Sequence, residues 1–269
     1  MKRYILILTV SMMALACSKN TFTHRNQLNL YSEAELQQMA NTEYRATLAK
    51  SKVVSPSVSK DAEMVTRVGN RIANAVNTYF RDKKEDNPYK DYKWEFNLVD
   101  DKQVNAWCMP GGKVVVYTGL LPVAQNEAAL AVVMGHEITH ALAKHGNERM
   151  SQGMLQELGG VALSVAVANK PAETQNIFMT AYGVGTTVGG ILPFSRKQEL
   201  EADHYGLILC AVAGYNPREA VPFWERMQKM SNGQEPPELL STHPSDETRI
   251  EQVKKYSEEA MKYYKPMNK

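Results

Sequence analysis

The chain has 269 residues, of which 43% are hydrophobic and 22% are charged, which is an ordinary globular composition that fits one domain or two small ones. Its formal net charge of +2 provides no field to attract polyanions, so we expect no nucleic-acid partner. Three cysteines are too few for a disulfide scaffold.

The first sixteen residues have the pattern of a signal peptide. A basic start, MKR, precedes an apolar run over residues 4–16 that is too short to span a bilayer but suits the core of an export signal. The run ends in ALAC at residues 14–17, which resembles the bacterial lipobox, in which the cysteine receives lipid and becomes the new N-terminus. Removal of residues 1–16 leaves 29 basic against 29 acidic residues.

We therefore expect an exported protein of the bacterial cell envelope, attached through lipid on Cys17 and facing the periplasm, with the outer membrane favoured over the inner. A simple secretory signal cleaved near Ala16, with Cys17 incidental, is the alternative. Residues 18–30 are polar and unpatterned, which predicts a tether. The division is then a signal over 1–16, the lipidated cysteine and tether over 17–30, and one domain over 31–269.

The first half of this domain mixes helices and strands. Ser32 and Glu35 have capping-box spacing, and Asn126 is placed to cap a later helix that Gly146 follows. The periodicity predicts helices over 32–50, 61–80 and 127–144, strands over 94–99 and 113–118, and a short strand-like piece over 104–108.

The second half is mainly helical. Residues 153–193 are rich in glycine and alanine and predict two closely packed helices around 169–171, with a buried hairpin favoured over a membrane contact. Further helices are expected over 197–213, from Asn216-Pro217 onward, and over 245–264. The fold class is therefore α+β, mainly helical with a small sheet.

His136-Glu137-Ile138-Thr139-His140 carries the chemistry. Two histidines four residues apart lie on one helix face, so both imidazoles can reach one tetrahedral metal ion. Glu137 directly follows the first histidine, and it can take a proton from water at the metal and return it to a leaving amine. A solvated helix face with two histidines is the alternative for this motif alone.

A second motif, Glu199-Leu200-Glu201-Ala202-Asp203, supplies what the first one lacks. Glu199 and Asp203 share a helix face, so Glu199 can be the third ligand and Asp203 can accept the free N–H of a ligand histidine. Glu201 points to the opposite side of the helix, roughly 200° around the axis from Glu199. Ordinary exposed carboxylates are the alternative here.

With both motifs, the chain resembles the zinc metallopeptidases of peptidase family forty-eight of the metallo class, which includes HtpX-like, BepA-like and CAAX-prenyl-endoprotease-like enzymes. The resemblance covers most of the chain, and its further matches are Val104-Asn105-Ala106, the stretch PGGKVVV over 110–116, Gly119-Leu120-Leu121, Ser195-Arg196 and Gly214-Tyr215-Asn216-Pro217. The soluble envelope members of the family are the most similar.

The resemblance implies a gluzincin-type domain that binds Zn²⁺, with the edge strand of the sheet lining the active-site cleft. The resemblance implies that His136, His140 and Glu199 are ligands and that Glu137 is the catalytic base. It also implies that Asp203 contacts a ligand histidine without binding the metal itself. Asn105 and Ala106 would belong to the strand that pairs with an extended peptide substrate. That mode of binding reads the backbone, so it suits unfolded or misassembled proteins.

Leu240-Ser241-Thr242-His243-Pro244 resembles the segment that brings a further histidine towards the metal in BepA-like members. His243 is then a catalytic candidate, either a fourth ligand that closes the site or a donor to the oxyanion. A loop histidine that caps the next helix is the alternative.

The other histidines are weaker candidates. Helical geometry turns His145 roughly 140° away from the ligand pair. His204 points off the metal face and His24 lies in the tether. Cys108 and Cys210 are either a disulfide or two buried thiols.

The expected activity is zinc-dependent hydrolysis of peptide bonds. Two alternative functions are left open. One is an envelope chaperone or assembly factor whose zinc is structural or is closed off by a fourth ligand. The other is zinc-dependent hydrolysis of a non-peptide bond. The natural substrate and the oligomeric state are not predicted.

Overall fold

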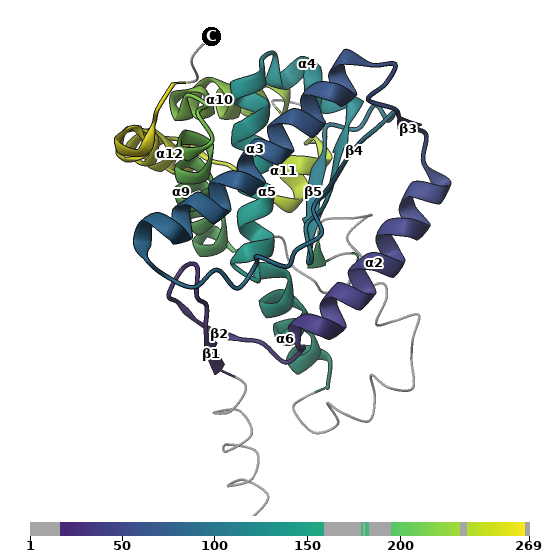
Figure 1. Cartoon of the computed structure of the whole chain (residues 1–269), viewed down its shortest axis with the longest axis vertical. Coiled ribbons are helices and arrows are strands. Elements are labelled where there is room, and N and C mark those ends of the chain that lie inside the picture. The colour runs from purple at the N-terminus through teal and green to yellow at the C-terminus, as the bar shows by residue number, and fades with distance from the viewer. Residues whose placement is uncertain (1–16, 159–178, 180, 183–194, 232–235, 267–269) are drawn as a thin grey trace, which may run out of the picture.

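A computed structural model describes residues 17–158, 179, 181–182, 195–231 and 236–266. Helix α5 (Glu127–Leu142) runs through the middle of the molecule and packs against helices α3 (Lys60–Lys83) and α9 (Arg196–Val212) and against the sheet (Figure 1). The fold is α+β and mainly helical, as predicted.

The main sheet has the order β3-β4-β6-β5, with β4 and β6 parallel and the other pairs antiparallel. Its strands are β3 (Val53–Val54), β4 (Glu95–Val99), β5 (Ala106–Met109) and β6 (Lys113–Tyr117). Strand β5 is therefore an edge strand. One face of β5 and β6 joins the core around α5, and the other packs with α2 (Glu33–Lys50).

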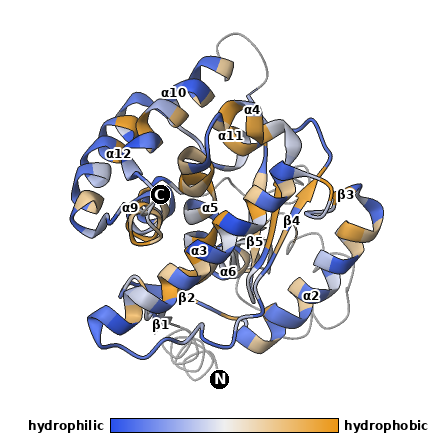
Figure 2. Cartoon of the chain, turned by 45° about the horizontal axis from the view of Figure 1, so that its top comes forward, coloured by the Kyte–Doolittle hydropathy of each residue, from blue (hydrophilic) through white to orange (hydrophobic). Residues whose placement is uncertain are grey.

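The remaining elements complete the domain on either side of α5 and α9. They are η1 (Thr118–Leu120), α4 (Leu121–Ala124), α6 (His145–Leu158), η2 (Pro217–Glu219), α10 (Ala220–Ser231), α11 (Glu238–Thr242), α12 (Glu247–Ala260) and η3 (Met261–Tyr263). Helix α12 packs on α9 and α10, with hydrophilic residues on its outer side (Figure 2). None of the helices in the described part of the chain is both long and apolar enough to cross a membrane.

Local signals in the sequence set the helix ends. The Ser32–Glu35 capping box opens α2, and the Asn126 side chain accepts from Ala129 N–H at the start of α5. The sequence predicts that Gly146 follows the end of α5, but the left-handed residue there is Lys144 (φ 56°), and Gly146 lies inside α6.

The predicted tether is wrong for the described residues 17–30. They form an antiparallel hairpin of β1 (Cys17–Lys19) and β2 (Asn26–Leu28) that packs on the domain. Phe22 is buried among Tyr79, Phe80 and Tyr205, so one aromatic residue in a polar segment provides the apolar contact. The predicted signal over 1–16 and most of the glycine-rich segment 153–193 lie outside the described residues.

Candidate metal centre

Helices α5 and α9 approach each other closely at two glycines, Gly135, which directly precedes His136, and Gly206. A Cβ atom on Gly135 would lie 2.8 Å from the carbonyl oxygen of Gly206. This close approach brings His136 and His140 of α5 to Glu199 of α9. All three side chains are buried.

The donor atoms of these side chains converge on one point. His136 Nε2 lies 3.0 Å from His140 Nε2 and 3.5 Å from Glu199 Oε2, and His140 Nε2 lies 3.4 Å from Glu199 Oε1. Ligands at 2.0–2.1 Å around a tetrahedral zinc ion are separated by about 3.3 Å. The predicted ligand set therefore fits a zinc ion.

His243 belongs to the same cluster. It is the C-cap residue directly after α11, and its Nδ1 lies 3.2 Å from His136 Nε2 and 2.9 Å from Glu199 Oε1. The four donor atoms of His136, His140, Glu199 and His243 lie within 4.8 Å of one another. His243 thus faces the metal position and is no solvent-exposed loop residue.

Glu137 lies next to this cluster in a buried setting. Its Oε1 has no hydrogen-bond partner in the described residues and lies 3.6 Å from His243 Nε2. Burial raises the pKa of Glu137 above its ordinary value. A buried carboxylate with a raised pKa, beside a metal position, suits proton transfer near neutral pH.

Asp203 contacts His136 through the ring nitrogen that does not face the donor cluster. Its Oδ1 lies 2.9 Å from His136 Nδ1, so it orients that ring and leaves Nε2 for the metal. Asp203 in turn receives two hydrogen bonds from Arg249, at 2.8 and 2.9 Å.

Arg249 was not predicted from the sequence. This buried guanidinium also lies 2.6 Å from Glu199 Oε2 and stacks 4.1 Å over the Trp224 ring. The sequence does contain an indication that Arg249 is buried, because this residue lies one helical turn before Val253 on the buried face of α12. A charged residue in an apolar stripe indicates a buried partner.

Arg249 sets the charge of the site. Burial by itself would raise the pKa of Glu199, but Arg249 and His243 outweigh it and hold that pKa well below its ordinary value. Burial lowers the pKa of His140 well below its ordinary value, which keeps the ring neutral. An ionised Glu199 and a neutral His140 are the forms that bind a metal ion.

The predicted orientation of His145 is wrong. Its Nδ1 lies 2.9 Å from His140 Nδ1, because α5 has ended and Lys144 takes a left-handed conformation before His145 begins α6. An angle extrapolated along one helix does not apply across this break. Glu201 is outside the ligand cluster, as predicted, but it accepts a hydrogen bond from His145 Nε2 at 2.9 Å.

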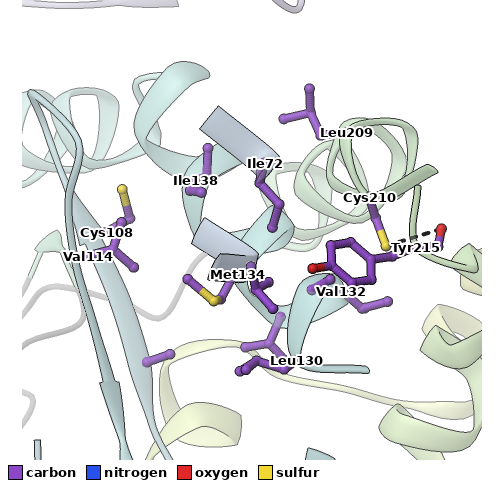
Figure 3. Packing of buried hydrophobic residues seen from close by; sticks show 14 of the residues in the cluster. Ile72, Cys108, Val114, Leu130, Val132, Met134, Ile138, Leu209, Cys210 and Tyr215 are labelled. Atoms are coloured by element: carbon purple, nitrogen blue, oxygen red, sulfur yellow. Dashed lines mark hydrogen bonds between the residues drawn. The ribbon is translucent and has the colours of Figure 1, made fainter. Parts of the chain in front are cut away.

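Other candidates lie away from the donor atoms. His204 stacks on Tyr256 and pairs with Glu259, as its predicted orientation implies. Cys108 and Cys210 are both free and buried, with residues of α5 between them in Figure 3.

Ala106 begins edge strand β5, which packs against α5, and Asn105 directly precedes this strand. Tyr117 N–H donates to Asn105 O, and hydrogen-bonded pairs alternate along an antiparallel ladder, so the backbone N–H and C=O of Ala106 point away from β6. The Asn105 side chain accepts from Ala106 N–H at 2.9 Å.

A protein-family model and several curated proteins match this chain. The model of Peptidase family M48 matches residues 59–257. The mitochondrial metalloendopeptidase OMA1 of Schizosaccharomyces pombe is 36% identical over 172 residues, which are 63% of this chain and 48% of that protein. OMA1 of Bos taurus is 29% identical over 254 residues, 91% of this chain and 47% of that protein.

A bacterial relative matches as well. The beta-barrel assembly-enhancing protease of Escherichia coli is 29% identical over 163 residues, which are 58% of this chain and 33% of that protein. The chain spans about half the length of the first of these curated relatives.

Proposed function

The chain belongs to Peptidase family M48, and on this premise we propose that it is a zinc-dependent endopeptidase. The spacing of the donor atoms of His136, His140 and Glu199 carries this proposal, because it is close to that of ligands around a tetrahedral zinc ion. The adjacent buried carboxylate of Glu137 adds a proton acceptor.

In the proposed reaction, zinc supplies Lewis acidity that polarises a scissile carbonyl and makes water easier to deprotonate. Glu137 accepts the proton of the attacking water at its carboxylate and returns it to the leaving amine. Asp203 holds the His136 ring by its Nδ1, and Arg249 keeps Asp203 and Glu199 ionised. Burial of the whole set excludes bulk water from these charges.

We assign peptide binding to the edge of β5, at Asn105 and Ala106. A substrate in extended conformation would add to this edge by main-chain hydrogen bonds. Asn105 has to release Ala106 N–H before a peptide can accept from it, since its own side chain occupies that donor. Recognition of the backbone suits unfolded or misassembled proteins as substrates.

We further propose that the protein is a lipoprotein of the bacterial cell envelope, anchored through Cys17. The lipobox-like residues 14–17 support this setting, and so does the similarity to the E. coli protease. Other relatives carry the name mitochondrial. Because residues 17–30 pack on the domain, lipid on Cys17 would hold the domain close to the membrane surface.

A second function, a chaperone or assembly factor with a latched metal site, is favoured by one observation. His243 Nδ1 has the ligand spacing to both His136 and Glu199, so it is placed to act as a fourth ligand. A zinc site with four protein ligands leaves no open position for water.

Cleavage of unfolded casein by the purified protein separates these functions. The assay compares added zinc, chelator, and Glu137→Gln with zinc. We expect cleavage with zinc, loss of it with chelator, and loss of it in Glu137→Gln although that variant still binds zinc. Absence of cleavage with one zinc ion bound per chain would contradict the endopeptidase and support the latched site.

A further inference from the structure

Three side chains form a hydrogen-bonded series that begins at His140 Nδ1, the ring nitrogen that does not face the metal position. His140 Nδ1 contacts His145 Nδ1 at 2.9 Å, and His145 Nε2 contacts Glu201 Oε2 at 2.9 Å. Arg25 Nε then donates to Glu201 Oε2 at 2.9 Å. His145 is fully buried, and the side chains of Arg25 and Glu201 are 14% and 11% exposed.

This series of hydrogen bonds determines which nitrogen of each histidine ring carries the hydrogen. When His140 Nε2 binds a metal ion, its Nδ1 carries the hydrogen and donates to His145 Nδ1. His145 then carries its own hydrogen on Nε2 and donates to Glu201, whose charge Arg25 balances. Each ring therefore donates its hydrogen bond in the same direction, from His140 to His145 and from His145 to Glu201, and Glu201 is paired with Arg25.

Arg25 belongs to the N-terminal hairpin, which is fixed to the end of the metal-binding helix. Asn20 Nδ2 donates to Leu142 O at 3.0 Å, and Gln27 Nε2 donates to Ala143 O at 2.7 Å. These are carbonyls at the C-terminus of α5 that lack partners within the helix. Arg25 also makes two hydrogen bonds of 2.7 Å to Glu148 of α6.

We propose that Arg25, Glu201 and His145 are positioning residues for the metal ligand His140, so that the N-terminal hairpin is a structural part of the metal centre. The inference rests on the proposed zinc site. It gives His140 the kind of support that Asp203 and Arg249 give His136: a carboxylate paired with a buried or nearly buried arginine. For His140, one further histidine extends the path to a segment more than one hundred residues away in the sequence.

The test measures zinc affinity by competition with a chromophoric chelator, and the absorption spectrum of the Co²⁺-substituted protein, on the full chain at neutral pH. The variants are Glu201→Gln, His145→Phe and Arg25→Met. Loss of such outer contacts weakens metal binding by about 10–100-fold. We expect losses in this range for Glu201→Gln and His145→Phe, about tenfold for Arg25→Met, partial recovery in Arg25→Lys, and a shifted Co²⁺ spectrum.

Two controls separate positioning from a general loss of structure. Arg218→Met removes an exposed arginine–glutamate pair outside the donor cluster and should leave zinc affinity unchanged. Glu148→Gln weakens the docking of Arg25 but leaves the path from Glu201 to His140 intact, so zinc affinity should change less than twofold.

The outcomes are distinct. Unchanged zinc affinity and Co²⁺ spectra in Glu201→Gln and His145→Phe, with zinc bound by the unmodified protein, would overturn this inference alone. An equal loss in Glu148→Gln and Glu201→Gln would also overturn it, because hairpin docking in general would then be the cause. Absence of zinc binding by the unmodified protein would overturn the proposed function together with the inference.

Discussion

At the scale of single residues, Arg249 balances the charge of the site. It contacts Glu199 and Asp203 within a buried cluster that also holds Glu137, so one guanidinium faces three carboxylates. Removal of one partner from a buried ion pair costs about 3–5 kcal/mol, since the other partner keeps its charge without compensation.

We therefore expect Arg249→Met to lower the free energy of unfolding of the metal-free protein by about 3–5 kcal/mol. Urea denaturation at neutral pH measures this change. Arg218→Met, at an exposed pair, should change it by less than about 0.5 kcal/mol. Similar values for the two variants would show that Arg249 does not balance the buried carboxylates.

His243 is the second residue whose replacement is informative. Its Nδ1 lies among the donor atoms of the cluster, so His243→Ala should change casein cleavage by at least about tenfold. An increase indicates a latch that has been opened, and a decrease indicates a lost oxyanion donor. His204→Ala, which removes a histidine that contacts Tyr256 and Glu259, should leave cleavage unchanged. Unchanged cleavage and zinc affinity in His243→Ala would exclude both roles.

At the scale of elements, the crossing of α5 and α9 determines whether the ligands meet. A Cβ atom on Gly206 would lie 2.9 Å from His136 N, so a larger residue there has to separate the two helices. Such overpacking costs about 1–3 kcal/mol.

Gly206→Ala should therefore weaken zinc binding as well as stability, because Glu199 and the two histidines belong to the two helices that cross here. Gly206→Ser should have the larger effect. Zinc titration and thermal unfolding of both variants measure the two effects. Lower stability with unchanged zinc affinity would show that the ligands do not depend on the helix spacing.

At the scale of the whole molecule, the N-terminal hairpin is part of the folded domain. Burial by itself would raise the pKa of Glu148. The hydrogen bonds from Arg25 and Gln198 outweigh burial, so the pKa lies below its ordinary value of 4.5. A carboxylate with a lowered folded-state pKa stabilises the protein fully above its unfolded-state pKa. That stabilisation is lost as the pH falls through the lower folded-state value.

Glu148→Gln should therefore lower the free energy of unfolding at pH 7 by about 2 kcal/mol, since it removes hydrogen bonds to a charged group. The difference between the original protein and the variant should shrink as the pH falls below 4.5. Urea denaturation from pH 7 to pH 3 measures this difference at each pH. A constant difference over that range would show that ionised Glu148 does not hold the hairpin.

Much of the local structure could be predicted because its causes are local. The Ser32–Glu35 capping box and the Asn126 cap determine where two helices begin. The four-residue spacing of His136 and His140 places both on one helix face whatever surrounds the helix. The candidate third ligand, Glu199, came from a motif whose spacing could be compared with that of a known family.

The tertiary structure decided what depends on residues far apart in the sequence. The turn at Lys144 brought His145 to His140, and an aromatic contact of Phe22 held a polar segment against the domain. Arg249 joined the site because α12 packs on α9. The sequence by itself therefore determined that His136 and His140 can share one metal ion, since covalent spacing along one helix places both on the same face. Only the packing of separate elements determined which charges support that chemistry, because such contacts depend on distances that the sequence does not contain.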